Sequence, residues 1–300
     1  MGFINVFVSS SVYANIENKQ LKLTKKESGE SITYPLDDLS SVVFDNSQSV
    51  VSIKTLCKLS ENNVIAYFCD EKHVPQTYLL AYNAYYKNLS NYLKQVEVKK
   101  PTLKNIWKNI VKQKIQNQIE VLNLLNKNHN LDDYLSKVQS DDSKNIESVV
   151  ANKYFKILFG IEFNRREESN INGALNYGYA IIRGAIARSV VAHGLQPFLG
   201  IHHCNKLNNF NLVDDLIEPY RPLVDLLVCT NQEIFLKELN SQSKMILLNV
   251  LNIDVLYCNQ KQSVQYSIEN MVENYVKCIT NNNFNINLPK IIKLQIHEYE

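Results

Sequence analysis

The stretch Asn170-Ile-Asn-Gly-Ala-Leu-Asn-Tyr-Gly-Tyr-Ala-Ile-Ile-Arg-Gly-Ala-Ile-Ala-Arg-Ser-Val-Val-Ala-His193 predicts one long helix at the centre of the fold. Ser169 or Asn170 can cap its start, and Gly194 can end it. Small side chains let neighbouring backbones pack close to a helix. Those in this helix include Gly173, Ala174, Gly178, Ala180, Gly184 and Ala185.

Next along the chain come Gly200-Ile-His-His-Cys204 and Asn211-Leu-Val-Asp-Asp-Leu-Ile-Glu-Pro-Tyr-Arg-Pro222. A histidine pair therefore stands shortly before a cluster of carboxylates, and packing alone does not call for that density of ligand types. Mg²⁺ and Mn²⁺ prefer oxygen ligands, and Mn²⁺ also accepts imidazole. The segment is suited to metal-assisted phosphate chemistry. Its candidate residues are His202, His203, Asp214, Asp215 and Glu218.

The spacing of the acids is compatible with a shared site. Glu218 follows Asp214 by four residues and Asp215 by three, so on a helix these carboxylates are neighbours. Their repulsion costs about 0.2–0.5 kcal/mol per pair, which a bound cation would reverse. The alternative is an acidic helix start capped by Asn211 and favoured by the helix dipole. His202 and His203 should point to opposite faces of an extended segment, so we expect at most one of them in the site.

The part of the chain before residue 80 alternates like a β structure. Short apolar runs are separated by turn residues, and one helical segment interrupts them. The pattern predicts a small β-sandwich-like domain over residues 1–78. The expected strands are Phe3–Ser9, Gln20–Lys25, Ser31–Tyr34, Ser41–Phe44 and Val64–Phe68, with a helix at Ile53–Glu61.

The remainder has helical periodicity. We therefore expect an α+β protein in which an all-helical catalytic domain spans residues 79–300. Besides the central helix, the expected helices are Leu103–Leu125, Asn145–Phe159, Leu223–Leu239, Ser243–Leu251 and Val264–Ile279.

Composition bounds the class of protein. The chain has 300 residues, 45% hydrophobic and 21% charged, which is typical of a globular protein. A net charge of +2 means that a polyanion must be held by a local patch. The six cysteines form no Cys-x-x-Cys pair, which favours a reduced, intracellular protein and argues against a zinc site. Neither a signal peptide nor a membrane-spanning run is evident, so we expect a cytoplasmic protein without a membrane partner.

Basic residues gather in two places. One is a lysine stripe, Lys104, Lys108 and Lys112, with Lys99, Lys100 and Lys114 close by and no Asp or Glu between Lys99 and Gln118. Such a stripe is either a solvated helix face or a surface for a phosphate backbone. The second spot is Arg165 and Arg166, just before the central helix.

Four motifs, taken in order, resemble one family. They are Ile146-Glu-Ser-Val-Val-Ala-Asn-Lys-Tyr-Phe155, Ile171-Asn-Gly-Ala-Leu-Asn-Tyr-Gly-Tyr179, Gly194-Leu-Gln-Pro-Phe-Leu-Gly-Ile-His-His203 and Phe210-Asn-Leu-Val-Asp-Asp-Leu-Ile-Glu-Pro-Tyr-Arg-Pro222. Their order is similar to that of the CRISPR-associated spacer-acquisition integrase/endonuclease family, the large metal-dependent subunit of the adaptation complex, in the type II branch.

The resemblance implies a metal site. Carried onto this sequence, the ligands are Glu147, His203 and Glu218, holding Mn²⁺ or Mg²⁺. His202, Asp214 and Asp215 then lie near the site. From the residues alone, Glu147 would be a first-turn glutamate favoured by the helix dipole.

The resemblance also implies the activity and partners. The protein would insert spacer DNA into a CRISPR array by joining a 3′-hydroxyl to a phosphodiester of the repeat. It would act on double-stranded DNA as a homodimer joined through the β domain. A small partner subunit would complete a heterohexamer, and the RNA-guided effector nuclease and a ring-shaped accessory protein are further expected partners. Besides the stripe, the expected DNA contacts are Lys153, Arg165, Arg166, Arg188, Lys206 and Arg221.

Two other functions remain open from the sequence. One is a repair-type, metal-dependent nuclease that acts on branched DNA with the same site. The other is a DNA-binding module without catalysis, in which the acids only cap helices.

Overall fold

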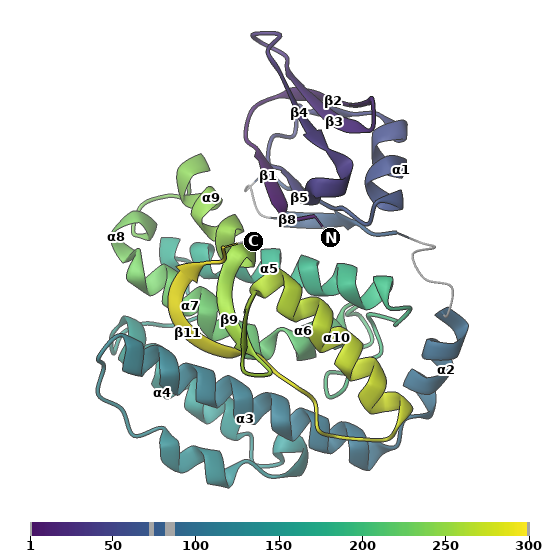
Figure 1. Ribbon diagram of the computed structural model, residues 1–300. Coiled ribbons are helices and arrows are strands. Elements are labelled where there is room, and N and C mark those ends of the chain that lie inside the picture. Colours follow the sequence, from purple (N-terminus) through teal and green to yellow (C-terminus); the bar gives the residue numbers. More distant parts are fainter. Residues whose placement is uncertain (1, 72–74, 82–87, 299–300) are drawn as a thin grey trace.

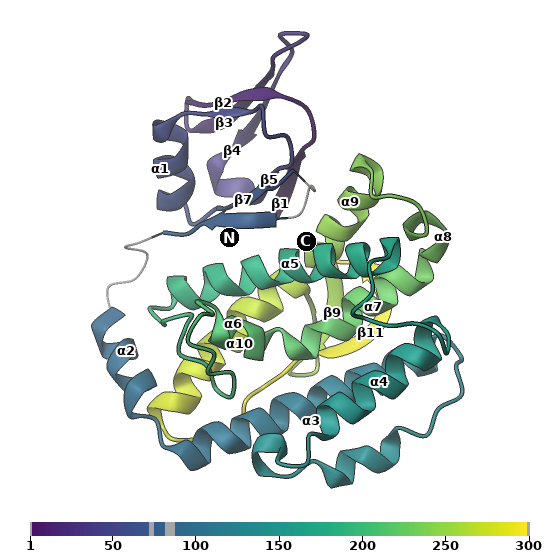
Figure 2. The same ribbon diagram turned by 180° about the vertical axis from the view of Figure 1, so that it is seen from behind.

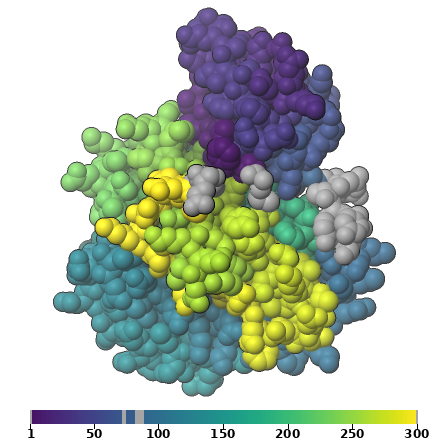
Figure 3. Space-filling model, viewed as in Figure 1, coloured from purple at the N-terminus to yellow at the C-terminus, as the bar shows by residue number. Residues whose placement is uncertain are grey.

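The computed structural model describes residues 2–71, 75–81 and 88–298. Met1 and residues 72–74 of the predicted first domain, and residues 82–87 and 299–300 of the predicted second, lie outside this description. A smaller β-rich unit sits on a larger, mostly helical unit (Figures 1 and 2). The space-filling view shows the C-terminal segment, in yellow, lying across one face of the larger unit (Figure 3).

Within the described residues, two four-stranded sheets form the β-rich unit, as the sequence pattern predicts in outline. Buried apolar residues of both sheets, such as Val42 and Leu21, share one core with Leu59 of the helix α1 (Ile53–Glu61). The first sheet has the order β1 (Ile4–Val8), β5 (Leu39–Phe44), β7 (Ile65–Cys69) and β8 (Pro75–Leu79), and only β8 is antiparallel to its neighbour. The second has the order β4 (Ser31–Pro35), β3 (Gln20–Lys25), β2 (Val12–Glu17) and β6 (Val50–Val51).

The first sheet is buried on both faces. Alternate residues of a strand point to opposite sides, so β5 sends Val42 and Phe44 into the core of the β unit and Val43 into the core of the helical unit. Ile65 and Tyr67 of β7 face the helical unit in the same way. This explains why all six residues of β5 are buried.

The larger unit packs its helices around α5 (Asn170–Ala192), the helix predicted to be central. Ser169 caps it by accepting a hydrogen bond from the backbone N of Asn172. The other helices are α2 (Asn88–Glu97), α3 (Lys100–Leu124), α4 (Ile146–Phe159), α6 (Asn211–Leu216), α7 (Arg221–Thr230), α8 (Gln232–Phe235), α9 (Ser241–Leu248) and α10 (Val264–Thr280). Short 3₁₀ turns in this unit span Asp132–Lys137, Ser140–Asp142, Glu218–Tyr220 and Asn249–Asn252, and another, Leu36–Asp38, lies in the β-rich unit.

The prediction of an all-helical second domain is wrong. A three-stranded antiparallel sheet lies within it, in the order β10 (Gln260–Ser263), β9 (Ile253–Tyr257) and β11 (Lys290–Ile296). Cys258 and Asn259 have positive φ values of 49° and 64°, which suits a two-residue hairpin turn between β9 and β10. The predicted helix 223–239 is also divided, because α7 ends at Thr230.

Among the contacts that join the units, two involve α5 and α9. The Tyr67 hydroxyl donates a 2.7 Å hydrogen bond to the carbonyl oxygen of Ile181, and the Tyr67 ring lies so close to Gly184 that a Cβ there would collide with it. In the second contact, buried Lys244 of α9 pairs with Asp45 at 3.0 Å. The small residues predicted to permit close packing therefore do so at Gly184. No helix in the described part of the chain is long and apolar enough to cross a membrane.

Replacing Gly184 with alanine should destabilise the protein. The added methyl group overlaps the buried Tyr67 ring, and overpacking of this kind costs about 1–3 kcal/mol. Gly173→Ala is the matched control, because a Cβ at Gly173 meets no atom within 4 Å. Replacing this helical glycine with alanine should raise the free energy of unfolding by about 0.5–1 kcal/mol. Urea unfolding of both variants measures the difference, and equal effects would contradict the close approach.

Candidate active site

The carboxylate of Asp215 organises the loop that carries the histidine pair. This carboxylate is fully buried and accepts hydrogen bonds from the backbone N of Ile201 at 2.6 Å, of His202 at 3.0 Å and of His203 at 3.2 Å. A Cβ on Gly200 would collide with the carbonyl oxygen of His203, so the tight loop requires glycine there. Asp215 is therefore a residue that shapes the loop.

Asp215 also fixes the imidazole of His203. Its Oδ1 lies 2.6 Å from His203 Nδ1, and this hydrogen bond raises the pKa of His203 against the lowering effect of burial. With Nδ1 engaged, Nε2 is the ring nitrogen left for a ligand. A carboxylate behind the other ring nitrogen is the usual support of a metal-binding histidine.

Both histidines lie against the buried side chain of Trp107. The His202 ring stacks on the indole with centroids 4.5 Å apart, and the His203 ring meets it edge-on at 5.7 Å. His202 Nδ1 also lies 3.0 Å from Asp141 Oδ1. The prediction that the two rings point to opposite faces is wrong, because the loop curls around Asp215 and is not an extended strand.

Glu147 and Glu218 contact the same ammonium group. Lys114 Nζ lies 2.5 Å from Glu218 Oε2 and is hydrogen-bonded to Glu147 Oε1. Glu218 also pairs with Arg221, whose Nε lies 2.9 Å from Oε1. Burial raises the pKa of Glu218, but Arg221 and Lys114 outweigh it and bring the pKa down to about 2. Glu218 is therefore an ionised carboxylate at neutral pH.

The start of α4 places Glu147 at this point. Asp142 accepts hydrogen bonds from the backbone N of Ile146 at 3.0 Å and of Glu147 at 2.9 Å. These bonds satisfy two amides that a helix start leaves unpaired. The position of Glu147 in the first turn, which the dipole alone would favour, thus also directs its side chain toward Lys114.

A pocket of about 420 Å³ opens beside these residues. His203, Asp214 and Glu218 line it together with Tyr179, Arg183 and Arg221. Among the described residues, no group of three or more His, Cys, Asp or Glu side chains is placed to hold a metal ion. The structure thus brings Glu147 to Glu218, and His203 to the pocket of Glu218. The three-ligand site stays a prediction.

Asp214 is committed to Arg183. The Arg183 guanidinium makes two hydrogen bonds to the Asp214 carboxylate, at 2.6 and 3.0 Å, and lies 4.7 Å from the centroid of the Phe210 ring. Asn208 adds a 2.7 Å hydrogen bond to the same carboxylate. Asp214 therefore holds an arginine at the rim of the pocket.

The predicted DNA-contacting residues have different surroundings. Lys104 of the stripe pairs with Asp141 at 3.2 Å, while Lys153, Arg166 and Lys206 are exposed. Arg188 is buried and pairs with Glu269 at 2.5 Å, which favours a structural role over a DNA contact. Lys108 and Lys112 are half-buried on α3. Arg165 donates hydrogen bonds to Asn172 and Asn176, and Arg221 lines the pocket.

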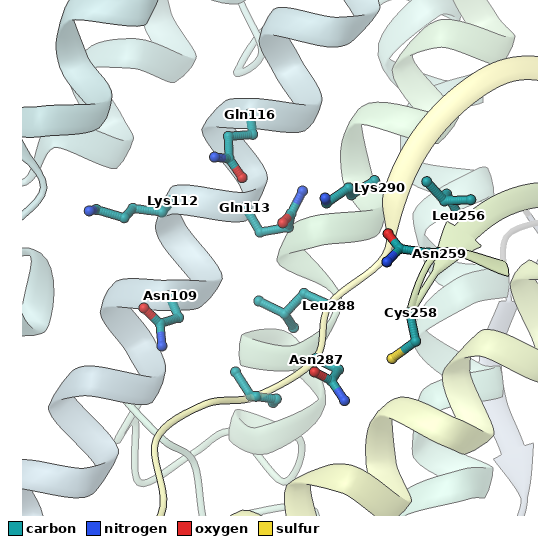
Figure 4. A pocket seen from close by; sticks show the side chains of 11 residues that line it. Asn109, Lys112, Gln113, Gln116, Leu256, Cys258, Asn259, Asn287, Leu288 and Lys290 are labelled. Carbon is teal, nitrogen blue, oxygen red and sulfur yellow. The ribbon is translucent and has the colours of Figure 1, made fainter.

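A second pocket of about 370 Å³ lies between α3, the β9–β10 turn and the segment before β11 (Figure 4). Lys112, Gln113 and Gln116 of α3 contribute to it, together with Asn259 and Lys290. The described residues that line this pocket include no carboxylate or imidazole, so its chemistry differs from that of the candidate site.

Sequence reasoning missed Trp107 and the role of Lys114. The sequence places Lys114 close to the basic stripe, but on the helix it is out of phase with Lys104, Lys108 and Lys112. Lys114 lies seven positions after Trp107, and seven positions are about two helical turns. Both residues therefore lie on the buried side of α3 with Ile110 and Val111. A lysine on the apolar face of a helix was the signal that could have found it.

Comparisons with known proteins agree with the four motifs. The family model described as CRISPR associated protein Cas1 matches residues 6–250. The chain is 33% identical to the CRISPR-associated endonuclease Cas1 of Neisseria meningitidis serogroup C (strain 8013), over the full length of both.

Two solved structures share the fold. A casposase bound to integration product matches with a TM-score of 0.79 and 19% identity over 95% of this chain and 93% of the casposase. A Cas6-RT-Cas1–Cas2 complex matches with a TM-score of 0.74 and 15% identity, over 97% of this chain and 36% of that one.

Asp225 should make stability depend on pH. Asp225 is buried and accepts a hydrogen bond from the Tyr179 hydroxyl. Burial raises the pKa of Asp225 from 3.8 to about 6. The folded state then binds a proton that the unfolded state has lost, so this contribution to stability falls as pH rises from about 4 to 6. The free energy of unfolding of Asp225→Asn, measured relative to that of the parent, should therefore rise by about 2–3 kcal/mol as the pH rises from 4 to 8. Urea unfolding across this range measures it, and a constant difference would refute the shift.

Proposed function

Because the chain belongs to the Cas1 family of CRISPR-associated proteins, we propose that it is a metal-dependent DNA integrase and endonuclease that inserts spacers into a CRISPR array. The observation that carries the proposal is the convergence of Glu147 and Glu218 on one cation, beside a pocket lined by His203. Carboxylates that meet at one point next to an imidazole are the donor set that Mn²⁺ accepts. The residues present thus fit the metal that the family implies.

Mn²⁺ or Mg²⁺ held by Glu147, His203 and Glu218 would act as a Lewis acid toward a phosphodiester. The protein's own side chains prepare the rest. Asp215 orients His203 so that Nε2 is free, and Arg183 and Arg221 place two positive charges at the pocket for a phosphate.

The proposed reaction is a direct transesterification. The 3′-hydroxyl oxygen of the incoming DNA end attacks a phosphorus of the repeat, and the bond from that phosphorus to the 3′-oxygen of the repeat strand breaks. One phosphodiester is lost and one is formed, so no external energy source is needed. The attacking hydroxyl gives up its proton and the leaving 3′-oxygen takes one up. No serine or cysteine nucleophile of the protein is required.

The partners follow from the relatives. One related structure is described as bound to an integration product, and another contains Cas1 together with Cas2. We therefore include in the proposal double-stranded DNA and a small Cas2-type subunit that completes a heterohexamer with homodimers joined through the β unit. Membership of the type II branch, with its effector nuclease and ring-shaped accessory protein, and a cytoplasmic location are parts of the same proposal.

Removing any one predicted ligand should abolish strand transfer. Glu147→Gln, His203→Ala and Glu218→Gln should each lower the Mn²⁺-dependent joining of a DNA end to a repeat-containing plasmid by about 100-fold or more, in line with the loss of transition-state stabilisation. Glu168→Gln, at an exposed position, is the control and should keep parental activity. Hydrolysis of branched DNA without joined product would favour a repair-type nuclease, and unchanged activity in Glu147→Gln would refute the ligand set.

Neutralising the stripe should weaken the salt dependence of DNA binding. Each phosphate contact contributes about 0.9 to the slope of log affinity against log salt. In the triple variant with Lys104, Lys108 and Lys112 changed to Gln, the magnitude of that slope should therefore fall by about 2–3. The control carries the same charge change on the β unit, at Lys22, Lys25 and Lys58, which pair with glutamates. If both triple variants keep the parental slope, the stripe is only a solvated face.

A further inference from the structure

We propose that Lys114 is a built-in cation that occupies the metal position in the metal-free protein, and that a divalent ion must displace it to bind. This inference rests on the proposed function. It adds that the Lys114 ammonium lowers the affinity of the site for the metal ion. Nothing in the family motifs of the sequence points to this residue.

The first support is the burial of Lys114 between the two carboxylates. Only 8% of its side chain and 9% of that of Glu218 are exposed. Its ammonium contacts an oxygen of Glu147 and lies 2.5 Å from an oxygen of Glu218. A single nitrogen is thus the point on which both predicted ligands converge, as they would on a metal ion.

The backbone around Lys114 is fixed at this point. Asn117, one turn further along α3, donates hydrogen bonds to the carbonyl oxygens of Pro219 at 2.7 Å and Pro289 at 3.0 Å. These bonds attach α3 to the turn Glu218–Tyr220 and to the segment before β11. The stem of Lys114 therefore emerges beside Glu218 whether or not the ammonium stays there.

The second support is charge balance. Glu147 and Glu218 carry two negative charges, and Lys114 and Arg221 carry two positive charges in direct contact with them. An unpaired buried carboxylate is costly, and here buried Glu218 and partly exposed Glu147 each have a cationic partner without a metal. A divalent ion at the same point would add two positive charges next to the ammonium, and at a separation of a few ångströms the repulsion is strong.

Lys114 is the member of this group that can leave. A lysine carries its charge on a flexible four-carbon stem. The Arg221 guanidinium, in contrast, is held 4.8 Å above the Tyr179 ring centroid and is bonded to Glu218. In this structure both glutamates are turned toward the Lys114 ammonium, so this group holds the point between them that a metal ion would need.

The test compares Mn²⁺ binding by the free protein, without DNA. Lys114→Met removes the charge and keeps a long side chain, so its Mn²⁺ affinity, measured by electron paramagnetic resonance of the free ion, should be at least tenfold higher than that of the parent. Its unfolding temperature without metal should fall, because two carboxylates lose a partner, and the rise on adding Mn²⁺ should be larger than in the parent. Lys114→Arg, which keeps the charge, should restore parental affinity. Lys100→Met, at an exposed position on the same helix, should change neither quantity.

The outcomes separate this inference from the proposed function. A parent that binds Mn²⁺ and a Lys114→Met variant that binds it equally or less tightly would overturn the inference and leave the function standing. Failure of both proteins to bind Mn²⁺ would overturn both proposals. If Lys114→Met does not fold, Lys114→Gln gives the same comparison, because its amide can still donate a hydrogen bond to a glutamate.

Discussion

The rest of this structure depends on the requirement that a buried carboxylate be paired. Burying an unpaired charge costs more than folding can supply, so each such group must find a partner where two elements meet. Asp45 pairs with Lys244 between the two units, and Glu269 pairs with Arg188 between α10 and α5. Glu218 meets Lys114 of α3 in the same way. These pairs therefore lie at the crossings that define the architecture.

The same requirement builds the candidate site. Asp215 satisfies its oxygens with the backbone of the histidine loop, and in doing so it gives His203 its orientation. Asp214 satisfies its oxygens with Arg183 and leaves that guanidinium at the pocket. Residues that appear as one acidic cluster in the sequence thus have three different tasks. One shapes a loop, one holds an arginine, and Glu218 faces the position of a cation.

Prediction from the sequence succeeded where local pattern decides the outcome. The bounds of α1, the capping of α5 by Ser169 and the β-rich first unit follow from periodicity and turn residues. The sequence does not predict the strands β9, β10 and β11, since a short run such as Ile253–Tyr257 becomes a strand only when a partner strand pairs with it. The two histidine rings were misplaced for a similar reason, because Asp215 bends their loop toward Trp107.

The sequence by itself determined the family, the order of most elements and the residue types of the candidate site, because motifs and periodicity are properties of neighbouring residues. Only the tertiary structure decided what each of these residues contacts. Lys114 is 33 residues from Glu147 and reaches Glu218 across the turn after α6, and no local pattern specifies such a meeting. It arises because α3, α4 and the Glu218–Tyr220 turn pack side by side, and packing alone determines which charge lies between the two carboxylates.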